Sequence, residues 1–175
     1  MKTVVTVLSC AFLLALVPFP DSQAQETPRA HAISVNPLGF VFGLMNVRYE
    51  QRVQGTNSFH VGGTLVPIYT NYMGFGLTGG YRWYFLPNEG RKALCGMAAG
   101  PFLSLLFWNY SGTASIGSEG GVVMILGGDL SYKWIWTNFM LEPSLELGFI
   151  PVKGKGDFYA TTAFLGLGLH LGYAW

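Results

Sequence analysis

The sequence predicts an all-β protein, an eight-stranded antiparallel up-and-down transmembrane β-barrel, and three observations lead to this fold class. Apolar residues alternate with small or polar ones along nearly the whole chain beyond residue 24. Charged residues make up only 11% of the chain, against about 25% in ordinary soluble domains. The longest apolar run beyond residue 24, 93–108, contains two glycines and a proline and is shorter than the ~20 residues of a spanning helix. A closed barrel is the other structure that satisfies every backbone polar group in lipid.

The first 24 residues have the features of a secretory signal peptide. Lys2 precedes an apolar run at 4–17, and Ser22-Gln23-Ala24 places small residues at the two positions that a signal peptidase reads. We therefore expect a signal peptide at 1–24 and a single barrel domain at 25–175. Only Cys95 remains in that domain, so no intramolecular disulfide is possible there.

Eight segments of alternating residues follow, separated by turns rich in Gly, Pro and Asn at 54–57, 86–92, 112–121, 136–138 and 151–157. The predicted strands are 32–42, 46–54, 58–69, 73–85, 93–108, 121–135, 138–150 and 160–175. In each segment one face is apolar and the other is small or polar. The second segment shows this clearly, with Val47, Tyr49 and Val53 opposite Arg48, Glu50 and Arg52. In the last segment the large apolar residues are Leu167, Leu169, Leu171, Tyr173 and Trp175.

The charges all lie on the small-and-polar faces of the strands. Residues 25–175 hold nine basic and eight acidic residues, because Lys2 and Asp21 account for the remaining two of the chain's ten and nine. Nine lie in the N-terminal tail, turns or loops, and eight lie within strands: Arg48, Glu50, Arg52, Arg82, Asp129, Lys133, Glu142 and Glu146. A Lys or Arg facing lipid at the midplane costs about 2–4 kcal/mol, which explains the exclusion. A soluble barrel of the lipocalin type would alternate in the opposite sense, and its solvent face would here be rich in glycine.

Eight strands leave an interior that side chains just fill. Four charges of each sign point into it, with His60 and His170 at a similar depth, and buried charges persist only when they are paired. We therefore expect an ion-pair network that plugs the lumen; the alternative is a path for protons or small ions.

The even strand number and the aromatic residues orient the barrel. In bacterial barrels an even number of strands returns both termini to the periplasm. Aromatic residues gather at two levels, as expected for membrane interfaces. The predicted periplasmic rim is Trp83, Phe85, Trp134, Trp136, Phe139, Tyr173 and Trp175; the predicted outer rim is Tyr69, Tyr72, Phe75, Phe107, Tyr110, Phe149 and Tyr159.

The sequence holds no arrangement typical of catalysis, of a metal site or of a cofactor site. Two enzyme types use such barrels, a lipid A deacylase and a lipid A palmitoyltransferase. The deacylase needs His and Ser two residues apart, and none of His31, His60 and His170 has a serine two residues later. The palmitoyltransferase needs a His, an Asp and a Ser at the outer rim, and no histidine lies near Asp157. A net charge of +1 gives no indication of nucleic-acid binding.

Lys153 and Lys155 lie in the last predicted outer loop. They could contact lipopolysaccharide phosphates as point charges, or they could be ordinary solvated lysines.

Two motifs resemble those of an outer-membrane barrel family whose function is not known. They are the early Asn-Pro-Leu-Gly of NPLGFVFGLMNVRYEQRV (36–53) and the Tyr-Arg-x-Tyr-Phe of YRWYF (81–85). More distantly, the architecture is similar to OmpX, to the OmpA barrel and to OmpW. The chain lacks the long loops of the OmpX type and a periplasmic peptidoglycan-binding domain, so the resemblance implies neither adhesion nor wall anchoring. The closing strand with Tyr173 and Trp175 resembles the signal that the barrel assembly machinery reads.

The sequence thus predicts a non-enzymatic bacterial outer-membrane protein, a monomer in contact with outer-membrane lipid, in a structural or surface-interaction role; contact with lipopolysaccharide through Lys153 and Lys155 is left open. The alternative is a narrow channel for small or hydrophobic solutes with a lateral gap near Pro101 or Pro143. A lipid A-modifying enzyme is the third possibility.

Overall fold

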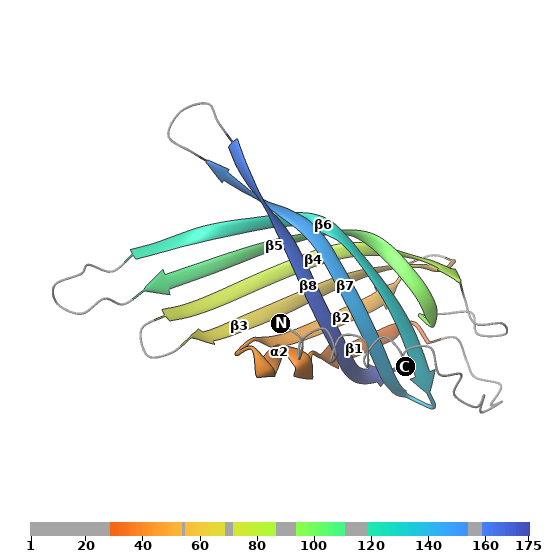
Figure 1. The fold of residues 1–175 in the computed structure, drawn as a ribbon. Coiled ribbons are helices and arrows are strands. Elements are labelled where there is room, and N and C mark those ends of the chain that lie inside the picture. The colour runs from red at the N-terminus through yellow and green to blue at the C-terminus, as the bar shows by residue number, and fades with distance from the viewer. Residues whose placement is uncertain (1–28, 54, 69–71, 87–93, 111–118, 154–158) are drawn as a thin grey trace, which may run out of the picture.

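The computed structural model describes residues 29–53, 55–68, 72–86, 94–110, 119–153 and 159–175. Eight strands form one closed antiparallel barrel in which each strand pairs with its sequence neighbour and β8 pairs with β1 (Figure 1). The strands are β1 (His31–Val35), β2 (Met45–Arg52), β3 (Asn57–Ile68), β4 (Tyr72–Leu86), β5 (Gly96–Tyr110), β6 (Glu119–Trp136), β7 (Phe139–Lys153) and β8 (Tyr159–Ala174). The predicted fold class is confirmed. The predicted signal peptide lies outside the described residues.

The prediction of one strand over 32–42 is wrong in its second half. The strand β1 ends at Val35, and Pro37–Val41 forms the short helix α2. Asn36 caps this helix, because its side chain accepts a hydrogen bond from the backbone N–H of Gly39 at 3.2 Å. Proline at the first helical position is favourable, since the N–H that it lacks would have no partner in the helix.

The alternation places one face of each strand on the outside of the barrel and the other in the lumen. Large apolar side chains on the outer face are about half exposed, among them Val61, Leu77 and Leu167. Inward-facing polar residues on the same strands are almost fully buried, as Ser58 at 0% and His170 at 3% show. The barrel is therefore apolar outside and polar inside over the part of the lumen that these residues line.

The two ends of the barrel differ. The end that carries Ala30 and Trp175, called here the termini end, is filled by a small apolar cluster: Ala32, Tyr84, Leu94, Cys95, Ala98, Ile135, Met140 and Ala174. Aromatic side chains surround it on the outside, with ring contacts between Trp136 and Phe139 and between Tyr173 and Trp175. At the opposite end, called here the far end, Phe75, Phe107 and Phe149 are exposed. Of the other predicted outer-rim residues, Tyr69 lies outside the described residues, and the side chains of Tyr72, Tyr110 and Tyr159 are not described.

The register gives the barrel a stagger of ten residues. Starting at Ile33, the paired residues are Tyr49, Val61, Gly79, Leu103, Leu126, Phe149 and Ala163. In the β1–β8 register Val35 lies opposite Leu171, so Ala163, eight residues from Leu171, would lie opposite position 43, ten residues beyond Ile33. Eight strands with this stagger tilt by roughly 40° from the barrel axis. Consequently the strand ends at the far end climb from β1 to β8.

Candidate functional site

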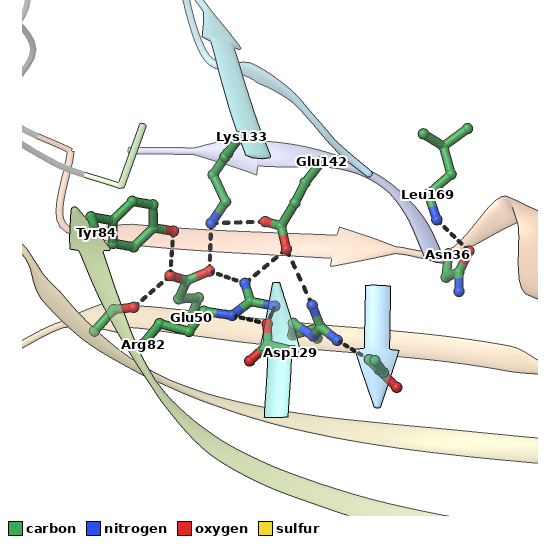
Figure 2. A network of polar contacts seen from close by, with 11 residues as sticks. Asn36, Glu50, Arg82, Tyr84, Asp129, Lys133, Glu142 and Leu169 are labelled. Atoms are coloured by element: carbon green, nitrogen blue, oxygen red, sulfur yellow. Dashed lines mark hydrogen bonds and ion pairs between the residues drawn. The ribbon is translucent and has the colours of Figure 1, made fainter. Parts of the chain in front are cut away.

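Seven charged side chains from four strands meet inside the barrel. Arg48 and Glu50 come from β2, Arg82 from β4, Asp129 and Lys133 from β6, and Glu142 and Glu146 from β7. Each lies on the inward face of its strand because residues two apart in a strand point to the same side. Figure 2 shows the central members converging from different strands of the barrel. We call this set the ion-pair network.

Arg82 occupies the centre of the network and is fully buried. Its Nε donates a hydrogen bond to Oδ2 of Asp129 at 2.8 Å, and its Nη2 lies 2.6 Å from the same oxygen. Its Nη1 donates to Oε1 of Glu142 at 2.7 Å and to Oε2 of Glu50 at 3.2 Å. One guanidinium thus joins carboxylates from three different strands (Figure 2).

Glu50 accepts hydrogen bonds from four donors. The Ser58 hydroxyl at 2.6 Å and the Tyr84 hydroxyl at 2.7 Å donate to Oε1. Arg82 and the Nζ of Lys133 donate to Oε2. Lys133 also lies 5.6 Å from the centroid of the Tyr84 ring, within cation–π distance. The carboxylate therefore has its acceptor positions occupied although it is 2% exposed.

Glu142 links the centre of the network to Arg48, which in turn contacts Glu146. Its Oε2 lies 3.1 Å from the Nζ of Lys133, and its Oε1 accepts a hydrogen bond from Nη1 of Arg48 at 3.2 Å. The Nη2 of Arg48 donates to Oε1 of Glu146 at 3.0 Å. Since the side chain of Glu146 is 26% exposed, the network ends there against a more open part of the lumen.

The buried charges of the network balance. Six of its members are at most 8% exposed, three of them basic and three acidic: Arg48, Arg82, Lys133, Glu50, Asp129 and Glu142. The surplus carboxylate is Glu146, the most exposed of the seven. Pairing of this kind is what allows charges to remain buried in the lumen.

The structure brings together seven of the eight charges that the sequence singled out. Arg52 is the exception: it lies at the end of β2, and its Nε donates to the backbone carbonyl of Gly55 in the following turn at 2.7 Å. Conversely, Ser58 and Tyr84 take part in the network and were not predicted. Both share the inward face with predicted residues of their own strands, so the same alternation could have identified them.

Besides Nη2 of Arg82 and Oδ1 of Asp129 within the network, and Oδ1 of Asn46, four buried polar side chains have an atom without a hydrogen-bond partner among the described residues. These atoms are Nδ1 of His60, Oγ of Ser131, Oγ of Ser144 and Nδ1 of His170. His60 and Ser58 are on β3, and His170 lies opposite Glu142 in the β7–β8 pairing. His31, by contrast, lies near the rim, where its Nδ1 is 2.8 Å from the Tyr49 hydroxyl. No group of three His, Cys, Asp or Glu residues suited to a metal ion occurs in the described parts of the chain.

The remaining predicted sites are only partly described. Lys155 lies outside the described residues, and Lys153 is described only as the last backbone position of β7. Trp175 exchanges backbone hydrogen bonds with His31 at 2.9 Å, and Tyr173 pairs with Ile33 of β1. These contacts close the barrel at the termini end.

Pro101 and Pro143, the predicted positions of a lateral gap, do not open the wall. The β4–β5 pairing is interrupted at Gly100–Pro101 and resumes in the same register at Trp83 and Ala99. The β6–β7 pairing is likewise interrupted at Glu142–Pro143 and resumes in register at Trp134 and Leu141. Both interruptions span two residue pairs.

Among the described residues no helix is long and apolar enough to cross a membrane.

No protein-family model matches the chain, and no curated protein matches it. Solved structures do. The N-terminal β-barrel domain of Pseudomonas aeruginosa OprF aligns with a TM-score of 0.52 at 13% sequence identity, covering 86% of this chain and all of that domain. The Yersinia pestis outer membrane protein Ail in a phospholipid nanodisc aligns with a TM-score of 0.49 at 13% identity, covering 84% of this chain and 99% of that one. The chain therefore shares the eight-stranded barrel fold of the OprF domain.

Proposed function

We propose that the chain is a non-enzymatic integral protein of a bacterial outer membrane whose lumen is plugged by the ion-pair network. Its role is structural or lies in contacts with lipid and with the cell surface. Three features support this placement: the apolar outer face, the aromatic side chains at the two ends, and a fold shared with the barrel domain of OprF. With eight strands, both termini lie on the periplasmic side.

The observation that carries the proposal is the charge-balanced centre of the network. Arg82, Glu50 and Glu142 reach the middle of the lumen from three strands and bind one another there. An ion or solute that crossed the lumen would have to displace these contacts. Breaking a buried pair by removing one partner typically costs about 3–5 kcal/mol, so the closed state is strongly favoured.

Two further parts of the proposal concern partners. Lys153 and Lys155 would contact lipopolysaccharide phosphates from the far end. Tyr173 and Trp175 would present the closing strand to the barrel assembly machinery. The monomer is the proposed state in the membrane, since the barrel closes through its own β1 and β8.

Planar-bilayer recording tests the plug. The wild-type protein is expected to show no discrete openings, whereas the double variant Arg48→Ala with Glu142→Gln, which removes two linked members of the network, is expected to show them. Arg52→Ala is the matched control, because Arg52 contacts a turn carbonyl and not the network, and it should stay silent. Stable openings of the wild-type protein would contradict the proposal and favour a narrow channel. A changed lipid A mass spectrum in cells that express the protein would instead indicate an enzyme.

A further inference from the structure

The barrel wall is incomplete at the far end of the β1–β8 seam. Only four residue pairs join the two strands, from Ala32–Ala174 to Val35–Leu171. Strand β8 continues beyond Leu171 to Tyr159, and no strand of the described residues pairs with that edge of it. Figure 1 shows the far end of the β7–β8 hairpin diverging from the other strands, with α2 at the end of the short β1. We call this interruption the lateral notch; α2 and the 159–169 edge of β8 are its borders.

The sequence at Asn36–Pro37 enforces the notch. Odd-numbered residues of β1 direct their backbone groups toward β8, as the exchange between His31 and Trp175 shows. In a longer β1, position 37 would have to donate an N–H to β8, and proline has none. The chain instead turns into α2, and Oδ1 of Asn36 accepts the N–H of Leu169 at 3.2 Å. Asn36 thus satisfies one backbone donor of β8 in place of a strand.

The borders of the notch belong to the lipid-facing surface. On β8 the side chains of Leu165 and Leu167 are 66% and 45% exposed. On α2 the side chains of Val41 and Phe40 are 77% and 48% exposed. From Leu169 to Ala163 the edge rises by six residues of about 3.3 Å each, which at a tilt of roughly 40° is about 15 Å along the barrel axis. This is half of the ~30 Å hydrocarbon core, so the part of the notch between Leu169 and Ala163 matches the depth of one leaflet, and the edge continues beyond it to Tyr159.

Among the described side chains, the lumen beside the notch is uncharged and largely apolar, in contrast to the layer of the ion-pair network. Six of its inward-facing side chains on the far side of Glu146 are apolar and partly exposed: Leu106, Trp108, Val123, Ile125, Ile150 and Phe164. Val66 on the same face is buried. The polar residues there are Thr64, Thr78, Ser104 and Thr162, of which Thr78 donates a hydrogen bond to Ser104 at 2.9 Å. The network closes this region toward the termini end, because its six central members are at most 8% exposed. The notch therefore connects a largely apolar part of the lumen sideways with the surroundings of the barrel.

We propose that the lateral notch admits one acyl chain of an outer-leaflet lipid into the far half of the lumen, an inference that rests on the membrane placement proposed above. The acyl chain would contact Trp108 and Phe164, on the far-end side of the ion-pair network. The ester or amide carbonyl at the head of the acyl chain would accept the backbone N–H groups of Ala163 and Leu165. These two residues share the edge of β8 on which Leu169 donates to Asn36. Such partners are needed because unsatisfied backbone groups are costly in hydrocarbon.

Quenching of tryptophan fluorescence by brominated acyl chains tests this. One variant keeps only Trp108, with the other four tryptophans changed to Phe, and a reference variant keeps only Trp83, which is 50% exposed on the outer face. Both are reconstituted in phosphatidylcholine bilayers with and without brominated chains. We expect Trp108 to lose a share of its emission similar to that of Trp83. If aqueous acrylamide quenches Trp108 and brominated lipid does not, the lumen holds water and the proposal is overturned.

A closing variant locates the entry. Pro37→Val with Gly39→Thr, made in the Trp108-only protein, restores the missing N–H and disfavours α2, because a Cβ at position 39 would lie 2.7 Å from the carbonyl oxygen of Leu44. It should reduce the quenching of Trp108, while the control Pro143→Val, at the β6–β7 interruption, should not. Reduced quenching in the control would place the entry at β6–β7 and overturn the notch. If the closing variant gives no heat-modifiable band, the single-Trp comparison decides alone. Trp83 insensitive to brominated lipid would overturn the membrane placement as well.

Discussion

At the scale of single residues, Arg82 illustrates how a charge is held inside the barrel. Its side chain has no exposed surface, so the desolvation of its guanidinium has to be offset by its partners. Three carboxylates provide this, and each comes from a different strand. The arrangement also fixes the positions of these strands relative to one another.

Replacing Arg82 tests the energetic importance of the network. Arg82→Met is expected to lower the free energy of unfolding by about 3–5 kcal/mol, because it leaves Asp129, Glu50 and Glu142 with fewer cationic partners in a buried site. Arg52→Met is the matched control and should change it by less than about 1 kcal/mol, since its side chain binds a carbonyl in a turn. Urea titration in detergent micelles, followed by the shift between unheated and boiled samples on gels, measures both. Equal effects of the two substitutions on the free energy of unfolding would show that the contacts of Arg82 in the network do not stabilise the barrel.

Which charges enter the lumen could be predicted from the alternation, but their contacts could not. The rule that residues two apart share a face placed Arg48, Glu142 and the other strand charges inside. The rule does not say how deep in the barrel a side chain lies or which partner it contacts, so Arg52 and Arg48 were predicted alike. Arg52 lies where β2 ends, and its side chain binds a carbonyl of the following turn. Tyr84 was not predicted as a member of the network because the prediction considered only charged residues, and its hydroxyl is a neutral donor on the same face.

At the scale of elements, α2 is the part of the fold where the alternation pattern predicted a strand and the structure has a helix. The residues Asn36-Pro37-Leu38-Gly39 form a capping signature, with an N-cap side chain followed by proline at the first helical position. Five helical residues are, however, far fewer than an independently stable helix needs, so tertiary contacts decide whether such a segment forms. One of these contacts is the hydrogen bond from Leu169 to Asn36, which joins residues 133 positions apart. The register between β1 and β8, and with it the lateral notch, depends on contacts between residues far apart in the sequence. A pattern that repeats every two residues cannot predict such contacts.

The contact between β4 and β5 depends on a glycine. A Cβ on Gly100 would overlap the carbonyl oxygen of Tyr81 and lie 2.7 Å from its carbonyl carbon, and the strand pairs on either side of this interruption hold those backbone atoms in place. Gly100→Ala should therefore destabilise the barrel by about 1–3 kcal/mol or more, in the range of overpacked sites.

Gly79→Ala, on β4, is the matched control because an added Cβ there would meet nothing within 4 Å. It should leave stability unchanged or raise it by about 0.5–1 kcal/mol through the reduced entropy of the unfolded chain. The same urea titration reports both variants. A stable Gly100→Ala barrel would mean that β4 and β5 can separate at this point, contrary to the close approach of Gly100 to Tyr81.

At the scale of the whole molecule, the barrel is inverted relative to a soluble protein. Its central layer of buried residues is charged, and its outer surface carries the large apolar side chains: Val61, Leu65, Leu77, Leu103, Leu147, Leu165 and Leu167 are each 40–66% exposed. Contiguous apolar surface of this extent is rare on soluble monomers and is favourable in lipid. The inversion could be predicted from the sequence because it depends only on which residue types share a face.

A pair of identical substitutions at different depths tests this inversion. Val61 lies within β3 and is 49% exposed, and Val53 follows the last residue of β2 at the termini end and is 58% exposed. In a bilayer, Val61→Arg should lower the free energy of unfolding by about 2–4 kcal/mol and Val53→Arg by about 0–1 kcal/mol, since the cost of a lipid-facing arginine falls toward the interface. Urea titration of both variants in phospholipid vesicles measures the difference. On a barrel surrounded by water the two substitutions would both stay within about 0.5 kcal/mol of the wild type, because exposed positions tolerate charge. A depth dependence therefore distinguishes lipid from water around the same side chains, without any assumption about what the lumen holds.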